Sequence, residues 1–305
     1  MEKTERQSLG SAPIGWLLRT FAIPSIISMV VSTLYNIVDQ IFIGRGVGYL
    51  GNGATNVILP ITVIALALGL MIGDGATAYF SLCLGQKELK NAAQGVGNAL
   101  TLTIIVSVAL TVGSFVWLQS LCVLFGATET ILPYALEYGS VIVLGFPFYM
   151  FSMGFNSVVR ADGSPVYAMM ATLSGAILNT ILDPIFIFVF HMGVTGAAIA
   201  TVLGQIVSSI LTVVYLRRFR SVRLTRKCLI PQGKLCAIGK PVQATLVSLS
   251  RQVLFLLPAL VILPRFLGVE GALWAGPVGD ACAFVLALTL GFLELRKLDS
   301  RSVRL

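Results

Sequence analysis

Long, uninterrupted runs of apolar residues alternate with short polar segments along the whole chain. Eight such runs can be delimited, at residues 17–43, 56–84, 95–125, 131–159, 165–190, 195–216, 241–263 and 271–293. Each is long enough to cross the hydrocarbon core of a bilayer, about 30 Å, as an α-helix rising about 1.5 Å per residue. The runs are continuous rather than alternating, which argues against the strands of a membrane barrel. The sequence therefore predicts an all-α integral membrane protein, a polytopic bundle of about eight transmembrane helices.

The amino-acid composition excludes several classes of protein and of site. The chain has 305 residues, of which 56% are hydrophobic and 11% charged, whereas a soluble globular protein carries roughly 25% charged residues. So few charges cannot cover a water-facing surface, so we expect no soluble enzyme. A single histidine, and five cysteines without C-x-x-C spacing, predict no metal site of the His/Cys type. No P-loop is present, so we expect no direct use of ATP. We also expect no cofactor.

The basic residues predict the orientation in the membrane. If the N-terminus is cytoplasmic, 18 of the 21 Lys and Arg residues fall on the cytoplasmic side, Arg45 and Arg265 fall outside, and Arg251 lies within a helix. Cytoplasmic loops are enriched in Lys and Arg, so this asymmetry predicts that both termini are cytoplasmic. The net charge of +8 thus reports topology, and we expect no nucleic-acid partner. A cell inner membrane or plasma membrane is the expected location.

Residues 217–240 form a distinctive connector with eight basic residues and no acidic one. We interpret it as a cytoplasmic linker with some attraction to anionic lipid headgroups. It divides the chain into a cytoplasmic N-terminus (1–16), a first lobe of six helices (17–216), the linker, two further helices (241–295) and a cytoplasmic C-terminus (296–305).

A weak internal repeat spans that linker. The sequence GSPVYA at 163–168 is similar to GKPVQA at 239–244, and GVTGA at 193–197 is similar to GVEGA at 268–272. The two pairs keep nearly the same offset, which predicts that the last two helices are a second copy of the fifth and sixth. Both copies begin at the cytoplasmic side, so the repeat is parallel.

Ionisable residues inside membrane helices are costly, so they are candidates for function. Asp39 lies near the outer end of the first helix, and Asp183 lies about 27 Å along the fifth. Asn179 is one turn below Asp183 on the same helix face, and Thr201 is near the outer start of the sixth helix. These four polar groups share one depth and can hold a proton or Na⁺, because the cation neutralises the repulsion between two carboxylates.

Other residues are secondary candidates. We expect Tyr35, Asp74, Met29 and Met153 to line a substrate cavity, since aromatic rings attract cations and methionines adapt to varied ligands. Pro24 removes a helical hydrogen bond below Asp39 and is a candidate bend. The spacing Gly69-x-x-x-Gly73 predicts a close helix–helix contact.

Several of these segments resemble the multidrug and toxic compound extrusion (MATE) transporters, in particular their bacterial branches. The resemblance is carried by PSIISMVVSTLYNIVDQIFIG at 24–44, VRADG at 159–163, NTILDP at 179–184 and GVTGAAIAT at 193–201. It implies two six-helix lobes around a central cavity, and secondary active export of cationic amphipathic compounds by antiport against protons or sodium ions. It also implies that Asp39, Asn179, Asp183 and Thr201 are the cation-coupling residues.

The chain departs from that pattern in its second half. Only two helices of a second lobe are recognisable, so about four have no counterpart. This leaves two alternatives open: a flippase for lipid-linked sugars, for which the intramembrane Arg251 is thin support, and an internally deleted chain that does not transport. Association of two copies is a further expectation, since it would complete the second lobe.

Overall fold

The computed structural model describes residues 13–219, 221–222 and 228, together with scattered positions between 255 and 289. The described helices, in chain order, are α1 (Ile14–Gly46), α2 (Tyr49–Gly85), α3 (Leu89–Val116), α4 (Leu118–Leu124), α5 (Leu132–Ala161), α6 (Pro165–Pro184), the π-turn η1 (Ile185–Val189) and α7 (Gly193–Arg217). No strand occurs among these residues. The prediction of an all-α membrane bundle is confirmed, and six of these segments are long and apolar enough to cross a membrane.

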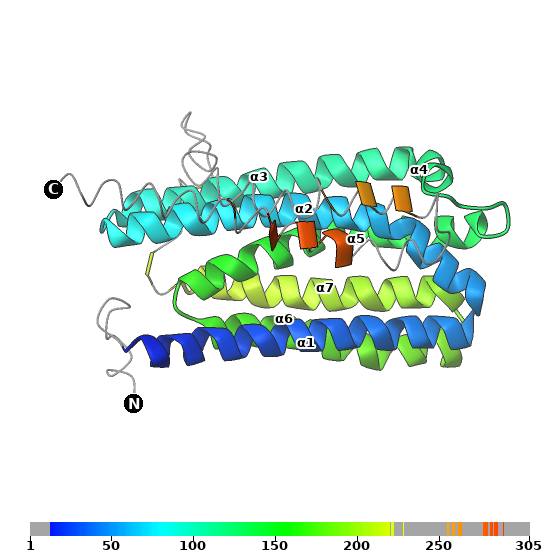
Figure 1. The fold of residues 1–305 in the computed structure, drawn as a ribbon, viewed down its shortest axis with the longest axis horizontal. Coiled ribbons are helices and arrows are strands. Elements are labelled where there is room, and N and C mark those ends of the chain that lie inside the picture. Colours follow the sequence, from blue (N-terminus) through cyan, green and yellow to red (C-terminus); the bar gives the residue numbers. More distant parts are fainter. Residues whose placement is uncertain are drawn as a thin grey trace.

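The six long helices lie side by side along the long dimension of the molecule (Figure 1). α2 and α3 lie along one edge and α1 and α6 along the other, with α5 and α7 between them. The most extensive contacts are α2 with α5, α5 with α7, and α6 with α7, whereas α1 packs mainly against α6. The predicted helices at 241–263 and 271–293, the internal repeat and Arg251 fall outside the described residues, apart from scattered positions.

The close helix contact predicted from Gly69-x-x-x-Gly73 is confirmed at the crossing of α2 and α5. A Cβ atom on Gly69 would lie 3.1 Å from the backbone of Met150, and one on Gly73 would overlap the backbone of Gly154. Two helices can approach this closely only where neither carries a side chain at the contact. The crossing fixes α5 against α2 next to Met153.

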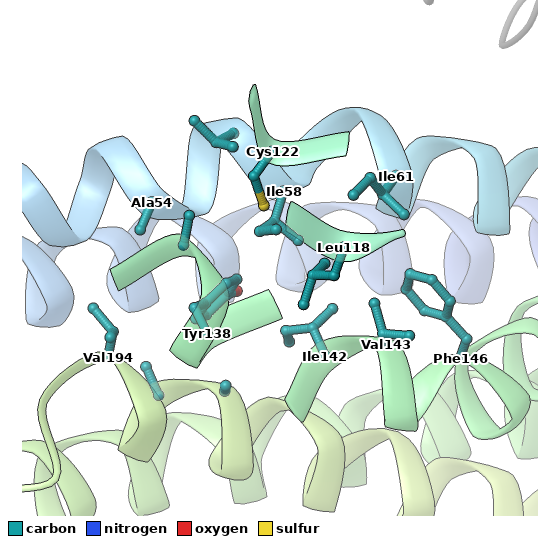
Figure 2. Close-up of a cluster of buried hydrophobic side chains, with 14 of the residues drawn as sticks. Ala54, Ile58, Ile61, Leu118, Cys122, Tyr138, Ile142, Val143, Phe146 and Val194 are labelled. Carbon is teal, nitrogen blue, oxygen red and sulfur yellow. The ribbon is translucent and has the colours of Figure 1, made fainter. Parts of the chain in front are cut away.

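Two apolar clusters fill the bundle on either side of this crossing. In the cluster shown in Figure 2, side chains of α2, α4, α5 and α7 meet around Ile58, Tyr138 and Phe146, all of them buried. The second cluster contains Phe80, Phe155 and other residues nearer the other end of the bundle. The first cluster matters for the site because it holds Tyr138 between α2 and α7.

α2 and α3 begin at Tyr49 and Leu89, before the predicted residues 56 and 95, and two of the predicted runs are not single continuous α-helices. The run at 95–125 is not one helix: it ends at Val116, and α4 follows as a separate short helix whose Leu118 and Cys122 are buried. These two side chains lie one turn apart on the same face of α4, and both pack against α5. Because of this packing, the chain turns back over the end of the bundle. The run at 165–190 also changes geometry, at Pro184, where a π-turn follows because proline has no N–H to donate.

The two ends of α2 provide a test of the predicted orientation. Tyr49 begins the helix and is 81% exposed, and Gln86 follows its end and is also exposed. In a cysteine-free background we expect Tyr49→Cys to react with an impermeant maleimide in intact cells, and Gln86→Cys to react only after permeabilisation. Reaction of Gln86→Cys in intact cells would mean that the orientation is inverted.

Candidate functional site

Asp39 lies in the second half of α1, on the side that packs against α6. Its side chain is only 6% exposed although most of α1 is open to the surroundings. Gln40 Nε2 lies 3.5 Å from Asp39 Oδ2, and the Thr55 hydroxyl of α2 donates a hydrogen bond of 3.1 Å to Gln40 Oε1. Asp39 is therefore connected to α2 through its neighbour.

Asn179 and Asp183 occupy successive turns of α6 and are almost completely buried. The amide Nδ2 of Asn179 lies 3.2 Å from Asp183 Oδ1 and 3.2 Å from Thr201 Oγ1 on α7. The Asn179 amide thus fixes the position of the Asp183 carboxylate on α6 relative to the Thr201 hydroxyl on α7.

The carboxyl groups of Asp39 and Asp183 lie against each other, within hydrogen-bonding reach if one of them carries a proton. The structure therefore brings together Asp39, Asn179, Asp183 and Thr201, from three helices, at one place and one depth. Their joint role in cation coupling remains the hypothesis drawn from the sequence.

Three oxygen atoms of this group have no hydrogen-bond partner among the described residues. They are Asp39 Oδ1, Asn179 Oδ1 and Asp183 Oδ2, and all three are buried. Buried polar atoms are normally paired, because leaving one without a partner costs free energy. Three unpaired acceptors on adjacent residues fit a proton or a hard monovalent cation, which would satisfy them and offset the repulsion between the carboxylates.

A cavity of about 530 Å³ opens beside Asp39. It lies among α1, α2, α5 and α7, and its wall includes Asp39 and Thr201 from the cluster. Of the predicted cavity residues, Tyr35 and Met153 line it. The volume is in the range of sites for drug-sized ligands, roughly 300–1,000 Å³.

The remaining predicted cavity residues lie elsewhere. Met29 is 67% exposed and does not line the cavity, because it projects from the open face of α1. Asp74 does not line it either; it interacts electrostatically with Arg160 of α5, towards the other end of the bundle. Pro24 is buried within α1, which continues as one helix through it.

Sequence reasoning missed most of the residues that line the cavity, and four of the missed residues bear directly on the site. Tyr138 and Tyr149 of α5 line the cavity, and Gln40 and Thr55 link Asp39 to α2. Uncharged polar and aromatic residues are common in membrane helices, so their identity alone gives little signal. The only available clue was position, since Gln40 is adjacent to Asp39.

Comparison with known proteins gives a consistent picture. The sequence profile of the MatE family matches residues 24–185, just over half of the chain. The multidrug export protein MepA of Staphylococcus saprophyticus is 29% identical over 202 residues, which cover 65% of this chain and 44% of that protein. MepA of Staphylococcus aureus is 28% identical over 204 residues, covering 67% of this chain and 45% of that protein. The chain therefore spans less than half the length of these relatives.

Solved structures show the same relation. The inward-facing conformation of a multidrug resistance MATE family transporter of the MOP superfamily superposes with a TM-score of 0.70 at 26% identity, covering 82% of this chain and 60% of that one. The outward-facing conformation of a transporter described in the same words gives 0.71 at 27% identity, covering 87% and 62%. The fold of this chain is thus similar to both conformations.

Proposed function

The chain belongs to the MATE family of membrane transporters, and from this premise we propose that it exports cationic amphipathic compounds in exchange for a proton or a sodium ion. Members of this family are transporters rather than enzymes. The observation that carries the proposal is the buried pair Asp39 and Asp183, which adjoins the 530 Å³ cavity and retains unpaired oxygen atoms. A cation site and a substrate cavity that share a residue provide a direct means of coupling.

Coupling follows from the charge on the pair. When a proton or Na⁺ binds, the two carboxylates no longer repel each other, and α1 can pack closely on α6. When the pair is empty, Asp39 presents negative charge to the cavity, which favours an organic cation there. The two cations therefore compete for one negative charge, so binding of one promotes release of the other.

The composition of the cavity supports an organic cation as substrate. Tyr35, Tyr138 and Tyr149 contribute aromatic rings, and Met153 contributes a flexible apolar side chain. Aromatic faces attract cations, while methionine adapts its shape to different ligands. Two relatives are named multidrug export proteins, which supports export of varied drug-like compounds. We place the protein in the cell inner membrane or plasma membrane, with both termini cytoplasmic.

A vesicle assay tests this proposal. Everted membrane vesicles containing the protein are placed in a bath with a fluorescent organic cation, and a gradient of protons or of Na⁺ directed from the lumen to the bath is imposed. We expect the gradient to drive movement of the fluorescent cation with wild-type protein, and Asp39→Asn to reduce that movement to background, because the neutral amide neither attracts the organic cation nor releases a coupling ion.

Glu137→Gln is the matched control. It makes the same carboxylate-to-amide change at an exposed position on α5, next to the cavity residue Tyr138, and should leave the movement intact. Equal activity of Asp39→Asn and wild type would contradict the proposal. Binding of the coupling ion without any movement of substrate would instead favour a chain that does not transport by itself.

A further inference from the structure

Polar side chains continue inside the bundle from the carboxylate pair towards its opposite end. On α7 they occur at alternating steps of four and three residues, which keeps them on one helix face: Thr201, Gln205, Ser208, Thr212 and Tyr215. Thr212 and Tyr215 are 1% and 6% exposed, so this face is turned inward. We call the polar seam these five residues of α7 together with the polar residues that meet them from the neighbouring helices: Ser164, Thr172 and Asn179 at α6, and Asn156 on α5.

α6 contributes the facing side of the seam. Asn179 and Thr172 are seven residues apart, close to two helical turns, and so lie along one face of α6; Ser164 immediately precedes the helix at that end. The two helices are in close contact there, since a Cβ atom on Gly175 would lie 2.6 Å from the carbonyl oxygen of Gly204. From α5, Asn156 Nδ2 donates a hydrogen bond of 3.1 Å to Thr172 Oγ1.

A small void lies next to the cation site; it is partly open and shares Ser32, Tyr35, Met153, Thr201 and Gln205 with the main cavity. Its volume is about 30 Å³; the lining is mostly apolar by area, but it includes the polar side chains of Asn179, Thr201, Gln205, Ser208, Thr172 and Ser152. A polar void of roughly 10–15 Å³ is already sufficient for one water molecule that has two or more polar partners. The void adjoins the cation site directly, because Asn179 and Thr201 belong to both.

The far end of the seam reaches a buried carboxylate in the loop between α5 and α6. The Tyr215 hydroxyl lies 2.7 Å from Asp162 Oδ2 and 2.8 Å from Ser164 Oγ, and the backbone N–H of Ser221 donates to Asp162 Oδ1 at 3.2 Å. Asp162 is 6% exposed, while its neighbour Gly163 is exposed. The charge distribution assigns this end of the bundle to the cytoplasm.

We propose that the polar seam is a hydrated path along which the small cation bound by Asp39 and Asp183 passes to Asp162 and the cytoplasm. The proposal rests on the proposed function, because it requires a cation at the pair. The path starts at Thr201 and Gln205, which also line the cavity, and runs within one lobe towards Asp162. For a proton, each hydroxyl or water accepts one proton and gives up one, so the carboxylate is left charged and the seam returns to its starting state.

The test measures access to the site from each side. A fluorophore is attached to Ile41→Cys, an exposed position on α1 two residues after Asp39, in a cysteine-free background. Everted vesicles expose the Asp162 end to the bath, and right-side-out vesicles expose the other end. Two jumps then distinguish the ions. If protons use the path, a rapid pH jump without Na⁺ changes the fluorescence. If Na⁺ uses it, a NaCl jump at constant pH does so.

Two substitutions block the path in different ways. Ala176→Val fills the void without removing a polar group, and Thr172→Val removes one hydroxyl at constant shape. We expect each to slow the response in everted vesicles about tenfold, comparable to the loss of one hydrogen bond in the barrier. The response in right-side-out vesicles should be unchanged. Thr180→Val, on the same helix but outside the void lining, should behave as wild type.

The outcomes separate the two proposals. A wild-type response that both substitutions leave unchanged would overturn the path alone, as would equal slowing from both sides. Absence of any wild-type response from either side would overturn the proposed cation site, and the path with it.

Discussion

Replacing Asp183 by asparagine is expected to abolish stabilisation of the protein by the proposed proton or Na⁺ while leaving the bundle folded. Asp183 is fully buried against Asp39, and its Oδ2 has no partner among the described residues. Asparagine has the same shape, keeps an oxygen to accept from Asn179, and adds an N–H that can donate to Asp39. The variant therefore supplies internally what the cation supplies in the wild type.

The expected size of the effect follows from binding linkage. A ligand at 100 times its dissociation constant stabilises the folded state by about 2.7 kcal/mol. For a folded unit of about 200 residues, the size of the described bundle, this raises the melting temperature by about 5–10 °C. We expect wild type to show such a rise with Na⁺ in place of K⁺, or on lowering the pH, and Asp183→Asn to show less than about 1 °C.

Thermal unfolding of the purified protein in detergent measures both variants. Without cation, Asp183→Asn should melt at or above the wild-type temperature, because the repulsion between carboxylates is removed. Glu137→Gln, which changes an exposed carboxylate, should keep the wild-type shift. A full cation-dependent shift in Asp183→Asn would show that the cation binds elsewhere.

The sequence was sufficient to predict that Asp39 and Asp183 lie at one depth, because charge and helical spacing both carry information about depth. Asp39 and Asp183 are rare carboxylates in apolar runs, and the spacing of Asn179 and Asp183 puts them on one face. Depth is only one coordinate, however. Asp74 was assigned to the cavity although it lies on another part of the bundle, since hydropathy does not reveal which way a helix is rotated.

The same limit explains the other errors. Met29 and Met153 are both methionines in membrane helices, yet only Met153 faces the cavity, because the packing of α5 on α2 and α7 sets its direction. The break after Val116 was missed because the chain stays apolar through it. It depends on burial of Leu118 and Cys122 by α5, a contact distant in sequence.

Substitution of Gly154 or Gly73 by alanine is expected to cause a large loss of stability for the addition of a single methyl group. A Cβ atom on Gly154 would lie 2.6 Å from the carbonyl oxygen of Gly69, and one on Gly73 would overlap the backbone of Gly154. Only backbone lies in the way, so no flexible side chain can move aside, and α2 and α5 must separate. Overpacking of this kind costs about 1–3 kcal/mol or more.

Gly85→Ala is expected not to lower the melting temperature in the same assay. Gly85 ends α2 and has no atom within 4 Å of its would-be Cβ, so alanine meets no obstacle there. Alanine favours a helix over glycine by about 0.5–1 kcal/mol, so this variant should melt at or slightly above the wild-type temperature. Gly73→Ala and Gly154→Ala should melt several degrees below it.

Since Met153 is adjacent to Gly154 and lines the cavity, separation of the helices should also weaken binding of an organic cation. Equal melting temperatures for the three variants would contradict the close crossing and its role in shaping the cavity.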